Sequence, residues 1–249
     1  LLKLSVPPEL SAEVQLAPGW KFAALDARVE ARALRARGVP LDAVSGRVTF
    51  SGTDFRATEV VLHQGENEAR GSYTMDTATR DYRFLLTGRL RPAGIDGWFS
   101  EWWPRLFGNF DFTTAAPEAD VDVQGRWGAN YLSTVFISVD AASAAIRQVP
   151  FDRVRTRLFI RPDFYDALDF SVTRGPAAAR GTFTRRVDLA ADAFRSMDFA
   201  VTSTLDVQEG ARIFGQSGLD IVEPFRFATP PRLGISGHLD GPAAPGGEP

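Results

Sequence analysis

The stretch VPLDAVSGRVTFSGTDFRATEVVLHQGENEARGSYTM, residues 39–75, recurs without gaps as VPFDRVRTRLFIRPDFYDALDFSVTRGPAAARGTFTR, residues 149–185. Eleven aligned positions are identical, and others exchange side chains of similar character, as Phe50 does with Ile160. An internal repeat of this length decides the architecture, because each copy is expected to fold as the same supersecondary unit. We therefore expect residues 39–75 and 149–185 to have the same strand pairings.

Weaker matches extend the repeat beyond these two stretches. The Phe-x-Phe motif at residues 110–112 resembles the one at 225–227, and a proline follows each motif within a few residues. The chain, residues 1–249, is then expected to be a fragment of a longer repetitive β domain. The predicted divisions are a first unit over residues 8–116, a second unit over 117–230, and the start of a third with a Pro- and Gly-rich tail over 231–249.

Apolar and polar residues alternate within each unit, which is the pattern of strands with one apolar face. Turn residues such as Gly65 separate these strands, and the short connections favour antiparallel pairing of successive strands. The sequence thus predicts an all-β fold, a long antiparallel sheet made of tandem repeats. The residues expected on one continuous apolar inner face are Val48, Phe50, Val60, Leu62, Tyr73, Phe84, Leu158, Ile160, Phe170, Val172, Phe183 and Phe199.

One short amphipathic helix is expected in each unit. In the first unit the residues spaced at helical intervals are Ile95, Trp98, Phe99, Trp102 and Leu106, which predicts a helix over residues 95–107 with this face on the sheet. In the second unit the shorter counterpart has Val207, Ala211 and Phe214 on one face.

The composition excludes several classes of function. Hydrophobic residues make up 44% of the chain and charged residues 24%, as in globular proteins. The net charge of −3 provides no basic surface for phosphates, so nucleic acid is not an expected partner. The absence of cysteine excludes disulfides and thiolate chemistry. No apolar run approaches the roughly 20 residues that cross a bilayer.

The sequence has no recognisable catalytic motif. Its two histidines, His63 and His238, do not accompany a nucleophile signature, and no phosphate-binding loop is present. Asp120 and Asp122 alternate with valines, which places them on the polar face of a strand rather than in a metal site. We therefore expect no catalytic residues, no metal and no cofactor. An enzyme acting on envelope glycans is a third hypothesis, and it requires clustered carboxylates.

The repeat resembles the AsmA-like superfamily, which includes TamB-type and YhdP-type envelope proteins. The resemblance rests on the repeat spacing of 110 residues (149 minus 39) and on the Val-Pro-x-Asp-x-Val element at residues 39–44 and 149–154. It also rests on the strand Val121-x-Val123-x-Gly125, which we align with Leu233-x-Ile235-x-Gly237.

This resemblance implies a long sheet curled into a groove, polar outside and apolar inside, in which phospholipid moves. It implies a periplasmic, non-enzymatic protein anchored to the inner membrane by a helix not present in this chain. Its partners would be phospholipid acyl chains and cell-envelope proteins, in transport between the two membranes or in envelope assembly. The alternative hypothesis is a closed β-sandwich that serves as an envelope scaffold without binding lipid. A second protein layer over the apolar face would favour this alternative.

Overall fold

The structure is a computed structural model that describes residues 2–98, 107–112, 114–188, 193–213 and 216–241. The described residues are all-β, as predicted, and the strand pairs within each unit are antiparallel. The strands are β1 (Leu2–Leu4), β2 (Glu9–Ala17), β3 (Lys21–Ala36), β4 (Val39–Ser51), β5 (Asp54–Gln64), β6 (Asn67–Asp76), β7 (Asp81–Arg89), β8 (Phe110–Asp111), β9 (Glu118–Arg126), β10 (Thr134–Ile146), β11 (Val149–Arg161), β12 (Phe164–Arg174), β13 (Ala177–Asp188), β14 (Ala193–Ser203) and β15 (Leu233–Asp240).

The chain divides into two compact units. The first unit comprises residues 1–108 and 116–133, and the second comprises 109–115 and 134–249. These boundaries separate two compact parts of the folded chain, whereas the predicted repeat units were defined by similarity of sequence. The two divisions therefore do not coincide.

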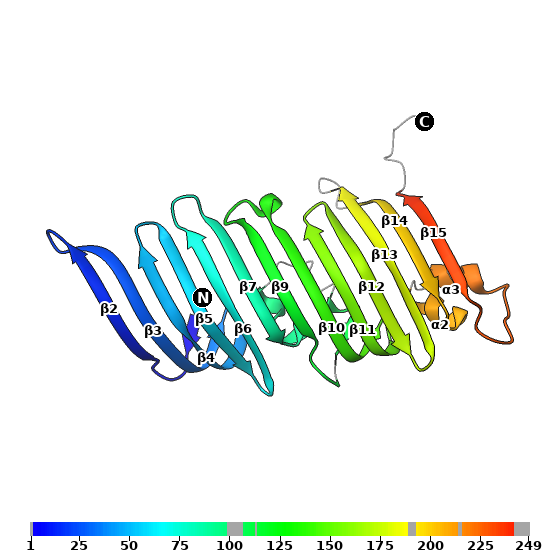
Figure 1. Cartoon of the computed structure of the whole chain (residues 1–249), viewed down its shortest axis with the longest axis horizontal. Coiled ribbons are helices and arrows are strands. Elements are labelled where there is room, and N and C mark those ends of the chain that lie inside the picture. The colour runs from blue at the N-terminus through cyan, green and yellow to red at the C-terminus, as the bar shows by residue number, and fades with distance from the viewer. Residues whose placement is uncertain (1, 99–106, 113, 189–192, 214–215, 242–249) are drawn as a thin grey trace, which may run out of the picture. The chain divides into compact units, whose positions relative to one another are not determined.

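The first unit is a sheet in which β1 and β2 both pair with β3, and the order continues β3-β4-β5-β6-β7-β9. Figure 1 shows β2 to β7 side by side, joined by short turns. Left-handed backbone at Gly38, Gly52 and Gly65 makes these turns, since a glycine without Cβ adopts positive φ at little cost.

The second unit repeats this plan. The short strand β8 pairs with β10, and the order continues β10-β11-β12-β13-β14-β15. Figure 1 shows these strands side by side in green to red, with α2 (Val207–Arg212) and α3 (Gln216–Val222) near one end of β14 and β15.

Neither unit contains a second sheet among its described residues, and in neither does the strand order return to its first strand. The closed sandwich considered from the sequence is therefore not the arrangement within either unit. Each unit is an open, single-layered antiparallel sheet.

The predicted equivalence of residues 39–75 and 149–185 is confirmed by the strand register. The strand triplets β4-β5-β6 and β11-β12-β13 have the same pairing except beside the bulge, where Arg47 pairs with Thr58 but Arg157 pairs with Asp169. Both triplets bulge at the same place, after Ala57 and after Ala167. Two hydrogen bonds repeat as well. The carboxylate of Asp42 accepts from the Gly65 amide at 2.5 Å, and that of Asp152 accepts from the Gly175 amide at 2.6 Å.

The structural repeat also extends further upstream than the sequence alignment. Ala33 in β3 and Ser143 in β10, 110 residues apart, both have positive φ (47° and 53°), and both are skipped in the pairing with the next strand. The repeat thus includes β3 and β10, whose sequences are less similar than those of the strands that follow.

The alignment of β9 with β15 was wrong by two residues. Leu86 of β7 pairs with Val121, and its counterpart Val201 of β14 pairs with Ile235. Val121 therefore corresponds to Ile235 and not to Leu233. A shift of two residues leaves the same face apolar, because side chains alternate with a period of two.

The predicted helix over residues 95–107 falls largely on residues 99–106, outside the described part of the chain, and so do Phe99, Trp102 and Leu106. Of its described residues, Asp96–Trp98 form a 3₁₀ turn, η2, and another 3₁₀ turn, η1 (Pro92–Gly94), precedes them. The second unit has two short helices, α2 and α3, where one was expected. Asp206 caps α2, accepting hydrogen bonds from the amides of Gln208 and Glu209.

Candidate functional site

The apolar side chains of the first unit form rows that run across the strands. Strand register aligns Leu25, Phe50, Phe55, Met75 and Tyr82 in one row. The next row along the strands consists of Ala27, Val48, Ala57, Tyr73, Phe84 and Val123. Because antiparallel neighbours on one face are in contact, these rows make a continuous apolar surface within the unit.

The second unit has matching rows. One row consists of Val135, Ile160, Tyr165, Arg185, Met197 and Leu239. The next consists of Ile137, Leu158, Ala167, Phe183, Phe199 and Gly237, and the one after it includes Val139, Phe170 and Val201. With one exception, Arg185, these side chains carry no charge.

One end of the apolar face is covered by protein in both units. In the first unit, Leu90, Ile95 and Trp98 pack against a cluster that includes Leu34 and Val39. The indole Nε1 of Trp98 also donates a hydrogen bond of 2.9 Å to the Ala36 carbonyl. The segment that follows β7 therefore covers the end of the sheet at the β3–β4 turn.

The second unit is covered at the same end by equivalent residues. Leu205, 6% exposed, and Ile213 at the end of α2 pack against Ala144, Val149 and Phe151. These three residues stand 110 positions after Leu34, Val39 and Leu41 of the first cluster.

The rows farther from the covered end have no second protein layer over them among the described residues. Outside the sheets, the elements with the most extensive contacts to the strands are η2 on β4, α2 on β11 and η3 (Asn130–Leu132) on β9. We call the two rows through Phe50 and Tyr73 in the first unit, and the two through Tyr165 and Phe183 in the second, the uncovered rows. Most of their larger side chains are half-buried, whereas Val135 and Ile160 in the second unit are buried, at 8% and 3% exposed.

Aromatic rings concentrate in the uncovered rows. In the first unit the ring centroids of Phe55 and Tyr73 are 6.0 Å apart, those of Tyr73 and Tyr82 6.2 Å, and those of Tyr82 and Trp127 5.1 Å. The Trp127 indole donates a 2.7 Å hydrogen bond to the Tyr73 hydroxyl, and partial burial raises the pKa of Tyr73. In the second unit the Phe183 ring lies 6.0 Å from Tyr165 and 6.3 Å from Phe170.

The twelve residues predicted for the inner face all lie on the apolar face of their unit. Three of them, Leu62, Ile160 and Val172, are only 7%, 3% and 5% exposed. Leu62 and Val172 belong to the covered clusters, so their contacts are with protein. The nine half-buried residues are Val48, Phe50, Val60, Tyr73, Phe84, Leu158, Phe170, Phe183 and Phe199.

The opposite face carries paired charges. Arg83 donates to both carboxylate oxygens of Asp122 at 3.0 and 2.7 Å, and its hydrogen bonds lower the pKa of Asp122. Arg47 pairs with Asp26 in the preceding strand, whereas its repeat counterpart Arg157 pairs with Asp169 in the following strand. Both faces are therefore defined within each unit, one apolar and one ion-paired.

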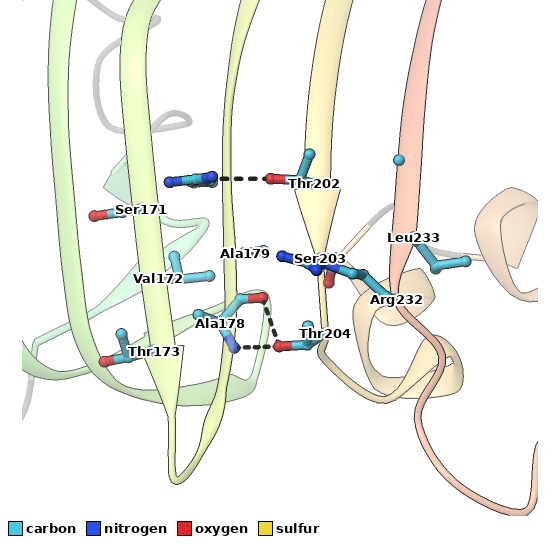
Figure 2. Close-up of a pocket in the computed structure, with 12 residues that line it drawn as sticks. Ser171, Val172, Thr173, Ala178, Ala179, Thr202, Ser203, Thr204, Arg232 and Leu233 are labelled. Carbon is cyan, nitrogen blue, oxygen red and sulfur yellow. Dashed lines mark hydrogen bonds between the residues drawn. The ribbon is translucent and has the colours of Figure 1, made fainter.

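A shallow hollow of about 650 Å³ lies at β12 to β15 in the second unit. Figure 2 shows hydroxyl side chains such as Thr173 and Thr204 at this hollow, with Arg232 extending beside Ser203. The Thr204 hydroxyl is hydrogen-bonded to the amide and the carbonyl of Ala178. No carboxylate or imidazole is among the lining residues, so this hollow lacks the paired carboxylates of a glycosidase.

The other chemical candidates from the sequence have structural partners. Asp120 accepts a hydrogen bond from the Thr87 hydroxyl, and Asp122 is held by Arg83. His63 lies 3.8 Å from the Glu68 carboxylate. In the described part of the chain, no three His, Asp or Glu side chains gather as a metal site would require.

His238 is held between two carboxylates. Its Nδ1 lies 2.6 Å from Asp198 and its Nε2 lies 2.9 Å from Asp240, and these hydrogen bonds raise the pKa of the imidazole. The three residues join β14 and β15 on the polar face, and no serine hydroxyl of the described chain is hydrogen-bonded to this imidazole.

Sequence reasoning missed Arg185. The alternation that makes Gly181 and Phe183 inner residues continues to Arg185, so the sequence contains the signal that places this charge on the apolar face. Ala167 was missed as well, because the bulge in β12 turns Ala167 inward, fully buried, and leaves Leu168 42% exposed.

No helix among the described residues has the length and apolar character needed to cross a membrane. Comparison with protein-family models, curated proteins and solved structures finds no match to this chain.

Proposed function

We propose that the uncovered rows bind the acyl chains of lipids, and that the protein is a non-enzymatic carrier or guide for lipid in the cell envelope. The observation that carries the proposal is the asymmetry of each sheet. One face is ion-paired, and the other presents half-buried apolar and aromatic residues that no described protein layer covers.

The energetics of lipid transfer explain why such a face is useful. Each methylene exposed to water costs about 0.8 kcal/mol, so a chain of about 16 carbons needs more than ~10 kcal/mol of apolar cover during transfer. Rows of side chains such as Phe50, Tyr73 and Phe84 supply this cover along a strand. A lipid bound there would in turn shield the rows themselves from water.

The resemblance to AsmA-like proteins supplies the cellular setting of the proposal. In that setting the protein works in the periplasm, held to the inner membrane by a segment outside this chain. Phospholipid would pass between inner and outer membranes, with other cell-envelope proteins at either end. The open sheet of each unit is compatible with such a route, because a bound chain can enter without the opening of a closed core.

The experiment is native mass spectrometry of the purified chain, followed by lipid extraction. We expect acyl lipid to co-purify with the wild type and to be lost from Phe50→Asp, which places an unpaired charge in the acyl path. Thr49→Asp, on the opposite face of the same strand, is the matched control and should keep its lipid. Circular dichroism verifies that both variants are folded.

The absence of lipid from a folded wild type, or its equal loss from the two variants, would contradict the proposal. In that case an envelope scaffold that uses the same face to bind protein becomes the better account.

A further inference from the structure

Arg185 is a cation in an otherwise uncharged row. It lies in β13 between Tyr165 of β12 and Met197 of β14, on the face opposite the ion pairs. The first unit has Met75 at the equivalent position, 110 residues earlier. A methionine therefore fits the fold at this place, and the arginine is a property of the second unit alone.

Aromatic residues, and not carboxylates, hold the Arg185 side chain. Its Nη1 donates a 2.7 Å hydrogen bond to the Tyr165 hydroxyl. The guanidinium carbon lies 5.6 Å from the Tyr165 ring centroid and 5.5 Å from that of Phe194. Stacking of this kind fixes the plane of a guanidinium and leaves its N–H edges available.

The charge of Arg185 is not neutralised within the described chain. No ion pair joins Arg185 to a described carboxylate, and its buried Nε has no hydrogen-bond partner among the described residues. On the opposite face, Arg153 and Arg157 each pair with an aspartate, whereas Arg180 is hydrogen-bonded to the Thr202 hydroxyl. An arginine has five N–H donors, and the hydrogen bond to Tyr165 uses one of those of the half-buried Arg185.

We propose that Arg185, together with the Tyr165 hydroxyl, binds the anionic group of an amphiphile whose apolar chain lies on the uncovered rows. This inference rests on the proposed lipid function and adds the chemistry of the head group. A guanidinium matches the two oxygens of a phosphate or a carboxylate through parallel hydrogen bonds. The Tyr165 hydroxyl accepts from Arg185 and can donate its own proton to the same anion.

The length of the face suits this arrangement. From Arg185 to Ala179 at the covered end, β13 advances six residues, or about 20 Å. One leaflet of a bilayer core, half of about 30 Å, requires about 15 Å for an acyl chain. A chain that starts at Arg185 therefore extends over Phe183 and Phe170 and ends near the cover formed by Leu205.

The test compares three probes with one acyl chain in common: a lysophosphatidic acid, a free fatty acid and a neutral monoacylglycerol. The wild-type chain should bind at least one anionic probe about 10–100-fold more tightly than the neutral probe, as expected for a charge-assisted hydrogen bond. Arg185→Met should remove this preference and keep the affinity for monoacylglycerol. Arg180→Met, on the opposite face of the same strand, should keep the preference. The two anionic probes distinguish a phosphate from a carboxylate head group.

Equal binding of anionic and neutral probes by the wild type would overturn the role of Arg185 and leave the lipid proposal intact. So would a preference that persists in Arg185→Met. If none of the three probes binds, the proposed function itself fails. Should the methionine variant unfold, Arg185→Gln repeats the test with a polar side chain.

Discussion

Replacing Gly71 with alanine tests the close contact between β6 and β7. A Cβ at Gly71 would lie 2.1 Å from the Leu85 carbonyl oxygen, and its repeat counterpart Gly181 would place one 2.2 Å from the Ala200 oxygen. An ordinary carbon–oxygen contact is about 3.3 Å, so β7 would have to retreat by about 1.2 Å. A shift of this size lengthens the hydrogen bonds between the two strands.

The expected loss is about 1–3 kcal/mol in the free energy of unfolding, the usual cost of forcing an extra carbon into a packed site. Urea unfolding followed by tryptophan fluorescence measures it well, because all five tryptophans lie in the first unit. With a slope of about 3 kcal/mol/M, the midpoint should fall by about 0.3–1 M.

Gly46→Ala is the matched control in the same unit, since a Cβ at Gly46 in β4 would lie no closer than 3.3 Å to its nearest neighbours, the Thr58 carbonyl oxygen and the Val60 side chain. It should lower the urea midpoint far less than Gly71→Ala does. A Gly71→Ala protein as stable as the wild type would refute the reasoning, because β7 could not then lie as close to β6 as the structure has it.

Three further predictions concern the second unit. Leu205→Ala should lower the free energy of unfolding, measured in urea, by about 2–5 kcal/mol, because it leaves a cavity in a buried cluster. The control is Leu239, which is 48% exposed and should tolerate alanine. Asp140 should titrate by NMR with a pKa of about 2, since the hydrogen bond from Arg153 lowers the pKa of its carboxyl group. The stability that Asp140 contributes to the fold should be present above pH 4 and be lost as the pH falls toward 2. A normal pKa would contradict the ion pair. His238 has a raised pKa, so the stability that it contributes to the fold should be complete below pH 6.5 and disappear as the pH rises through the pKa of the folded state. If the melting temperature of His238→Gln depends on pH in the same way as that of the wild type, this prediction is contradicted.

The apolar face could be predicted because alternation is a local property of the sequence. Once Val48 and Phe50 are assigned to one face, antiparallel pairing places Tyr73 and Phe84 beside them. The gapless repeat then transferred the same assignment to Phe170 and Phe183 in the second unit.

Bulges and covering contacts could not be predicted in the same way. At a bulge the register with the partner strand shifts, and the alternation of inward and outward side chains shifts with it. This is why Ala167 and not Leu168 faces inward. The cover formed by Leu90 and Leu205 depends on contacts with strands far away in the sequence. Alternation therefore could not separate buried Leu62 from half-buried Phe84, although both lie on one face.

Photo-crosslinking in cells tests the central claim most directly. A photoreactive amino acid is placed at Phe84 and Phe199 in the uncovered rows, and at their neighbours Leu85 and Ala200 on the opposite face. The account predicts lipid adducts from Phe84 and Phe199 and few or none from the two neighbours. Equal lipid labelling from both faces, or no labelling from either, would contradict a lipid-binding face.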